Sequence, residues 1–171
     1  MLVAALPLAA CRASEAGPGS GTGSAASSGL SAPAGWKALP SLANAAHDAA
    51  KTSGLAVDSA EAWGETARGC YGTWLSLTTT RAKPLKLADE FVKGIETEPS
   101  LAGIALTEVV KPAATTDNDM LSLAFAKPPY RGKVRARLVN DGHITALVCF
   151  WNEREPAACE AACGQLLGGL K

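Results

Sequence analysis

The chain has 171 residues, and its 16 Lys and Arg residues balance 16 Asp and Glu residues, so its net charge is zero. A neutral chain has no global attraction for nucleic acid or for an acidic membrane surface. No apolar run approaches the ~20 residues that a membrane-spanning helix needs. These properties argue against a nucleic-acid-binding protein and a transmembrane protein, and the length suits one folded domain.

The first residues form an apolar run, 2–10, that ends in small residues directly before Cys11. This is the pattern of a secretory signal and its cleavage site. Because a cysteine follows the small pair, residues 8–11 resemble the lipobox of bacterial lipoproteins. The resemblance implies a signal peptide over residues 1–10 and a membrane anchor through lipid on Cys11. Arg12, rather than Asp, follows the cysteine, which in that family favours an outer membrane lipoprotein facing the periplasm or the cell surface.

The start of this run departs from the usual pattern, because the first basic residue, Arg12, comes after the cysteine. A signal peptide normally opens with a positively charged region. Either the start codon lies further upstream and this region is truncated, or the run is a buried N-terminal helix with an ordinary cysteine.

The next segment, residues 12–35, favours the signal. It contains one Leu and no aromatic residue, and is otherwise rich in Gly, Ser and Ala. Such a segment has almost nothing to bury, and we expect residues 11–35 to be a lipidated cysteine with a disordered tether. A tether has a purpose after a lipid anchor and none after a buried helix.

A single globular domain is expected over residues 36–171, beginning with a helix between Ser41 and Gly54. Residues 55–63 and 70–79 follow as a hairpin, because the second run alternates with period two. A helix over 84–95 shows one apolar stripe after Pro84. Four strands and a helix that starts at Pro156 complete the pattern, with the strands at 103–110, 120–126, 133–139 and 143–151.

This order predicts an α+β fold: a mostly antiparallel twisted sheet of about six strands with helices packed on it. The opening Gly35-Trp36, the hairpin, the helix over 84–95, the run of strands and the terminal helix resemble the PsbP/Mog1-like fold. That resemblance implies a binding or assembly scaffold rather than a catalytic one. The tryptophans are expected in or near the core, with ligand stacking as the alternative: Trp36, Trp63, Trp74 and Trp151.

The register of the last hairpin follows from its apolar residues. A two-residue turn at Asp141-Gly142 would place the basic residues of the first strand on the apolar face of the second strand. A three-residue loop with a bulge at Gly142 pairs Val139 with His143 and gathers the apolar residues on one face. We therefore expect the bulged loop.

Four cysteines remain if Cys11 is lipidated, and an even number in an exported protein predicts two disulfides. A bridge within the last helix is disfavoured, because Cys159 and Cys163 lie one turn apart with roughly parallel Cβ vectors. Cys159 matches Cys149 in depth along the strand and the returning helix. The expected bridges are Cys149–Cys159 and Cys70–Cys163.

Other chemistry for these cysteines is less well supported. Cys149, Cys159, Cys163 and His143 lack the coupled knuckles of a structural zinc site. A nucleophilic pair such as Cys70 with His47 or His143 needs a free thiolate, which pairing would consume. No metal, catalytic or cofactor-binding residue is therefore predicted.

A basic row is the best candidate for a contact site. Arg131, Lys133, Arg135 and Arg137 recur with period two and share one strand face, with Lys127 just before. Such a row is either a solvated face or a patch for an anionic partner, such as a lipid headgroup, an envelope polymer or an acidic protein. The sequence thus predicts an envelope-anchored lipoprotein whose domain binds a partner without catalysis. The alternative is a secreted hydrolase or thiol-redox protein using Cys or His.

Overall fold

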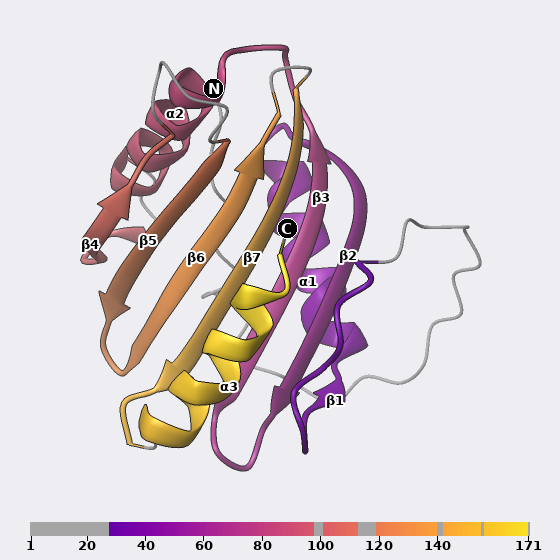
Figure 1. The fold of residues 1–171 in the computed structure, drawn as a ribbon, viewed down its shortest axis with the longest axis vertical. Coiled ribbons are helices and arrows are strands. Elements are labelled where there is room, and N and C mark those ends of the chain that lie inside the picture. Colours follow the sequence, from indigo (N-terminus) through magenta and orange to yellow (C-terminus); the bar gives the residue numbers. More distant parts are fainter. Residues whose placement is uncertain (1–27, 98–100, 113–118, 140–141, 155, 171) are drawn as a thin grey trace.

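The computed structural model describes residues 28–97, 101–112, 119–139, 142–154 and 156–170. Within them, seven strands form one antiparallel sheet accompanied by three helices, in an α+β fold (Figure 1). The elements are β1 (Lys37–Ala38), α1 (Pro40–Thr52), β2 (Ala56–Glu65), β3 (Cys70–Thr78), α2 (Pro84–Thr97), β4 (Ala105–Val110), β5 (Met120–Lys127), β6 (Tyr130–Leu138), β7 (His143–Asn152) and α3 (Pro156–Gly168). The strand order across the sheet is β1-β2-β3-β7-β6-β5-β4. The predicted fold class is confirmed.

The sheet has one strand more than the six predicted, and the addition is β1. This strand has two residues, Lys37 and Ala38, which pair with Gly64 and Trp63 of β2. A two-residue segment carries no alternating pattern, so periodicity could not reveal it. The six predicted strands correspond to β2–β7 in the same order.

The β6–β7 hairpin has the predicted register. Leu138 pairs with Ile144, and the Val139 N–H donates to the His143 carbonyl at 2.9 Å. Gly142 has a φ of 93°, a conformation that glycine adopts without a Cβ clash. The apolar residues of both strands therefore share one face, as their pattern predicted.

That face carries the larger core, which lies between the sheet and helices α1 and α2. Phe150 lies within it and is 1% exposed; its ring stacks on Tyr71 and meets Tyr130 edge-on. Gly132, which pairs with Phe150, leaves room for the Phe125 ring, since a Cβ there would lie 2.4 Å from that ring. A side chain at position 132 would displace the Phe125 ring.

The opposite face carries a second core, which α3 covers (Figure 1). The four tryptophans are all buried in it, between 4% and 9% exposed, so their predicted core position is confirmed. They surround the four cysteines of the domain together with Leu147, Leu166, Leu167 and Leu170. Both faces of the sheet are therefore covered, and the fold has three layers.

Residues 28–35 pack against this second core. The Ser28 N–H and hydroxyl donate to the Glu61 carboxylate at 2.8 and 2.6 Å. Leu30 packs against the cluster that contains Trp36. The end of the predicted tether thus contacts the domain, whereas Cys11, the predicted signal and the rest of the tether lie outside the described residues.

No helix in the described part of the chain combines the length and the apolar character needed to cross a bilayer.

Candidate functional site

Two disulfides fasten α3 to the sheet. Cys70 of β3 is bonded to Cys159, and Cys149 of β7 is bonded to Cys163. The Cα–Cα distances are 5.4 and 5.7 Å, within the range of natural disulfides. All four cysteines are buried, with at most 1% exposed. The predicted set of paired cysteines is confirmed.

The predicted partners were wrong, and the register of β3 explains why. Cys70 pairs with Trp151, so it lies at the end of the sheet where the chain leaves β7 for α3. Cys149 pairs with Gly72, two residues deeper, about 7 Å along the strand. Cys159 and Cys163 are separated by about 6 Å along the helix, a spacing close to that of Cys70 and Cys149. Cys159, nearer the start of the helix, therefore bonds to Cys70, and Cys163 bonds to the deeper Cys149. The prediction lacked the depth of Cys70, which only the β3–β7 pairing determines.

These disulfides bear on the two alternatives for the cysteines, a nucleophilic Cys–His pair and a zinc site. Because Cys70 is bonded to Cys159, it offers no thiolate to His47 or His143. Within the described ranges, no group of three or more His, Cys, Asp or Glu residues is arranged to hold a metal ion.

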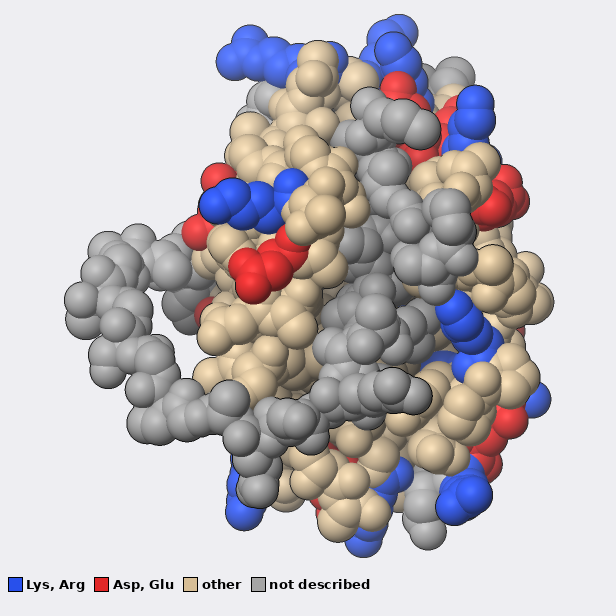
Figure 2. Space-filling model, turned by 180° about the vertical axis from the view of Figure 1, so that it is seen from behind, with Lys and Arg blue, Asp and Glu red and all other residues tan. Residues whose placement is uncertain are grey.

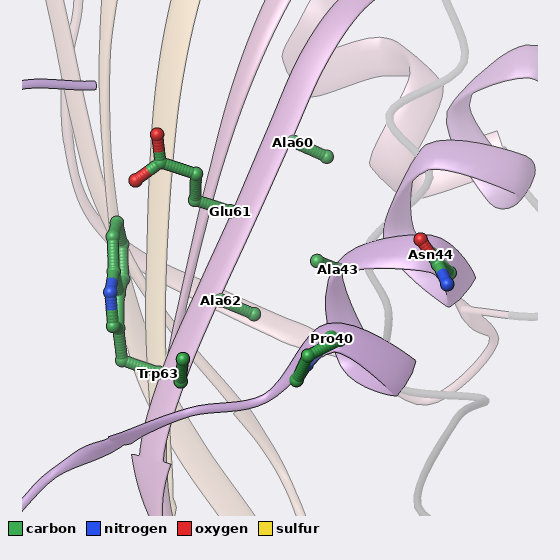
Figure 3. A pocket seen from close by; sticks show the side chains of 8 residues that line it. Pro40, Ala43, Asn44, Ala60, Glu61, Ala62 and Trp63 are labelled. Atoms are coloured by element: carbon green, nitrogen blue, oxygen red, sulfur yellow. The ribbon is translucent and has the colours of Figure 1, made fainter. Parts of the chain in front are cut away.

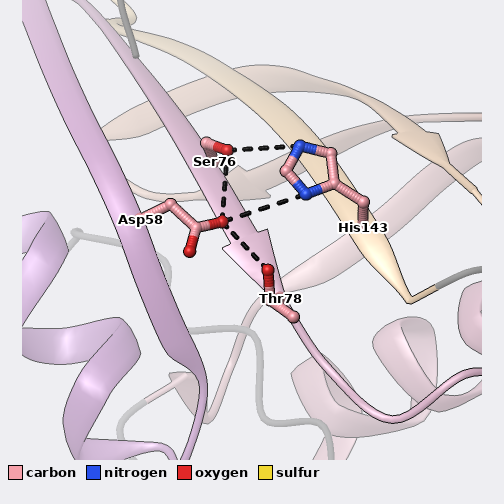
Figure 4. A network of polar contacts seen from close by, with 4 residues as sticks. All are labelled: Asp58, Ser76, Thr78 and His143. Carbon is pink, nitrogen blue, oxygen red and sulfur yellow. Dashed lines mark hydrogen bonds and ion pairs between the residues drawn. The ribbon is translucent and has the colours of Figure 1, made fainter. Parts of the chain in front are cut away.

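A polar cluster lies across β2, β3 and β7 (Figure 4). Its centre is the Asp58 Oδ2 atom, which accepts from the Thr78 hydroxyl at 3.0 Å and from Ser76 Oγ at 3.5 Å. His143 lies beside both, with Nε2 3.4 Å from Ser76 Oγ and Nδ1 3.9 Å from Asp58 Oδ2. Sequence reasoning missed this cluster, because its members come from three strands far apart in the chain.

The cluster has the residue types of a Ser-His-Asp triad without its geometry. The 3.9 Å between Asp58 and His143 is too long for the hydrogen bond that orients a catalytic histidine. Ser76 is only 3% exposed, and its hydroxyl is shared with the same carboxylate oxygen as Thr78. These contacts join the three strands beside the bulge of β2 between Val57 and Ser59.

The predicted basic row lies on the face that α3 partly covers. Arg131, Lys133, Arg135 and Arg137 alternate with buried residues of β6, so they do share one side of the strand. Lys127 ends β5 and pairs with Tyr130 at the turn into β6.

The charges of the row meet acceptors within the domain. Arg131 donates to Glu153 at 2.6 Å, Lys133 to Glu160 at 3.1 Å and Arg137 to Asp119 at 2.8 Å. Arg135 donates to the Leu167 carbonyl near the end of α3, at 3.2 Å. The hydrogen bond and charge of Asp119 raise the pKa of Arg137. Sequence reasoning missed these acceptors because α3 and the connecting segments bring them to β6.

Replacing Arg135 and Arg137 with Gln tests the row. We expect a loss of at most about 1 kcal/mol in the free energy of unfolding, because Arg135 supports the α3 C-terminus and the Arg137 pair is exposed. Binding to phosphatidylglycerol vesicles should fall and become less sensitive to salt, since Lys127, Arg131 and Lys133 remain. Urea unfolding and vesicle sedimentation measure the two effects. Vesicle binding equal to that of the wild type would show that the row is not a contact site for an anionic surface.

A hollow of about 380 Å³ lies at the outer edge of the sheet, between the start of α1 and β2 (Figure 3). Its walls are formed by Ala38, Pro40, Ala43, Asn44, Ala60, Glu61, Ala62 and Trp63. In Figure 3, Ala43, Ala60 and Ala62 point into the space between the strand and the helix, whereas Glu61 and Trp63 point to the other side of β2.

On the face covered by α1 and α2, basic and acidic side chains are interspersed among the residues drawn in colour, with uncharged surface between them (Figure 2).

No family model and no curated protein matches this chain.

Proposed function

We propose that this protein is an exported lipoprotein, anchored in the cell envelope through Cys11, whose domain binds a partner without catalysis. The observation that carries the proposal is the pair of buried disulfides, which uses all four cysteines of the domain. Disulfides persist in oxidising compartments and are rare where thiols are kept reduced. A chain with two such bonds fits the exported location that its first eleven residues suggest.

The N-terminal sequence supplies the rest of the address. The resemblance of residues 8–11 to a lipobox, with Arg12 next, supports an outer membrane location facing the periplasm or the cell surface. The order of strands and helices supports the resemblance to the PsbP/Mog1-like fold, with its implied role in binding or assembly.

The side chains that could carry chemistry favour binding over catalysis. A thiol-redox role needs a reactive thiol, and the domain cysteines are bonded and buried. A hydrolase needs an accessible nucleophile, and Ser76, the serine that contacts His143, is only 3% exposed. The alternative of a secreted hydrolase or thiol-redox protein is accordingly the weaker of the two.

Changing Cys11→Ala tests the anchor. Each buried CH₂ contributes about 0.8 kcal/mol, so two or three acyl chains hold a protein durably at a membrane. We expect the wild-type protein in the membrane fraction and the variant in the soluble fraction. Ultracentrifugation with mass spectrometry of the N-terminal peptide measures both. A wild-type protein that is soluble and unmodified at Cys11 would contradict the proposal.

A Ser28→Ala variant is the matched control for the anchor, since it changes the described start of the chain but not the cysteine. It should remain in the membrane fraction.

A further inference from the structure

The two disulfides do not follow the order of the cysteines along the chain. Cys70 is bonded to Cys159, so the first cysteine of the domain pairs with the third. Cys149 is bonded to Cys163, so the second pairs with the fourth. Four cysteines can form three sets of two bonds, and this is the set in which neither bond joins cysteines that are neighbours in sequence.

The unfolded chain favours other bonds, because short loops close more often than long ones. Cys149 lies ten residues before Cys159 and 14 before Cys163, so the non-native Cys149–Cys159 loop closes about 1.7 times as often as the native one. The loop of 89 residues from Cys70 to Cys159 closes about 16 times less often than the loop of 14 residues. Fewer than half of the first bonds are therefore expected to be native.

Only the folded sheet and α3 bring the native partners together. The pairing of β3 with β7, two strands far apart in the chain, determines the depth of Cys70. Such non-local contacts form slowly. α3 has 13 residues, a length at which an isolated helix is marginal in water. Before these elements pack, the bonds that form are expected to follow loop length.

A Cys149–Cys159 bond is incompatible with the native packing of α3 along β7 (Figure 1). It would shift α3 by about one turn, so that Cys163 would lie about 6 Å deeper than Cys149. Cys149 is itself about 7 Å deeper than Cys70. Cys70 and Cys163 would then be about 13 Å apart in depth, beyond the roughly 7 Å that Cα atoms of a disulfide allow. A chain with this bond cannot complete the fold.

Burial separates the native chains from the wrongly bonded ones. In the native protein all four cysteines are at most 1% exposed. Exchange of a disulfide requires that a thiolate reach one of its sulfur atoms. Native bonds are therefore protected from an external thiolate, whereas a chain on which α3 has not packed leaves its bonds accessible.

From these observations we infer that this protein is a substrate of a thiol–disulfide isomerase, which exchanges a Cys149–Cys159 bond and its companion for the native pair before α3 packs. The inference goes beyond the proposed function, because it concerns how the domain acquires its disulfides. It requires an oxidising compartment but no lipid anchor.

The rearrangement balances as three exchanges. A thiolate of the isomerase attacks the Cys159 sulfur, the Cys149–Cys159 bond breaks, and Cys149 leaves as a thiolate. Cys149 then attacks Cys163 in the companion bond and releases the Cys70 thiolate. Cys70 attacks Cys159 in the mixed disulfide, which forms the second native bond and returns the isomerase thiolate. Two disulfides are present before and after, so no net oxidation occurs.

The test refolds the full chain with Cys11→Ala, in which the four domain cysteines are the only thiols. Reduced, unfolded protein is diluted into oxidised glutathione, with or without a catalytic amount of reduced isomerase. Peptide mapping without reduction, after an acid quench, measures the bonds. Without the isomerase we expect native bonds in fewer than half of the chains and an abundant Cys149–Cys159 peptide. With it, the native fraction should at least double and that peptide should be lost.

Cys70→Ala/Cys159→Ala in the same chain is the matched control, because its two remaining cysteines leave nothing to rearrange. The isomerase should change the final yield of its Cys149–Cys163 bond less than about 1.2-fold. Bond formation is the readout, so the control does not need to fold. An isomerase whose active-site cysteines are replaced by serine should have no effect on the four-cysteine chain.

Native bonds in most chains without the isomerase, or a native fraction that the isomerase leaves unchanged, would overturn the inference. An equal gain from the serine-substituted isomerase, or a gain in the two-cysteine control, would do the same, because neither involves rearrangement. None of these results changes where the Cys11→Ala protein fractionates in cells, so failure of this inference and failure of the anchor are distinguishable.

Discussion

Removing the Cys70–Cys159 disulfide is expected to lower the free energy of unfolding by about 4.6 kcal/mol, and removing Cys149–Cys163 by about 3 kcal/mol. The first bond joins residues 89 apart in sequence and the second joins residues 14 apart. In the chain-entropy model the longer loop loses more freedom in the unfolded state. The difference between the two variants is thus the informative quantity.

Urea unfolding of the double variants Cys70→Ala/Cys159→Ala and Cys149→Ala/Cys163→Ala measures this difference. Both variants remove two buried sulfur atoms next to α3, so each is the packing control for the other. Peptide mapping without reduction should give a Cys70–Cys159 peptide and a Cys149–Cys163 peptide from the wild type. A larger loss from the shorter loop, or a Cys149–Cys159 peptide, would contradict the assignment.

Changing Phe150→Ala is expected to lower the free energy of unfolding by about 3–5 kcal/mol, the usual cost of emptying a buried aromatic site. Phe150 lies on β7, between β3 and β6, and is 1% exposed. Its neighbours cannot close the gap readily, because Tyr71 and Tyr130 are themselves held in adjacent strands. The ring contacts with both tyrosines are lost as well.

Thermal and urea unfolding check this result against Val110→Ala, which removes an apolar side chain that is 59% exposed on edge strand β4. The control should stay within about 0.5 kcal/mol of the wild type. A loss of less than about 1 kcal/mol from Phe150→Ala would mean that this part of the core is loosely packed.

The candidate sites were only partly accessible to sequence reasoning. Period two in β6 predicted that Arg131, Lys133, Arg135 and Arg137 share a face, because strand geometry alone determines it. Their acceptors Glu153, Glu160 and Asp119 come from segments whose positions depend on how α3 and β5 pack. Sequence reasoning also missed the short pairing of β1 with β2. This pairing covers two residues only, because the chain leads from Leu39 directly into α1.

Local chemistry in the sequence therefore determined the three helices, the six longer strands, the α+β class, the β6–β7 register and the need for two disulfides. Each follows from periodicity, turn residues or the number of cysteines, which act over a few neighbouring residues or over the whole composition. The tertiary structure decided the partners of the cysteines, because Cys70 acquires its depth only by pairing with Trp151 of a distant strand. It also decided that residues 28–35 pack on the second core, since the sites that receive Ser28 and Leu30 form only after β2 and α3 are in place.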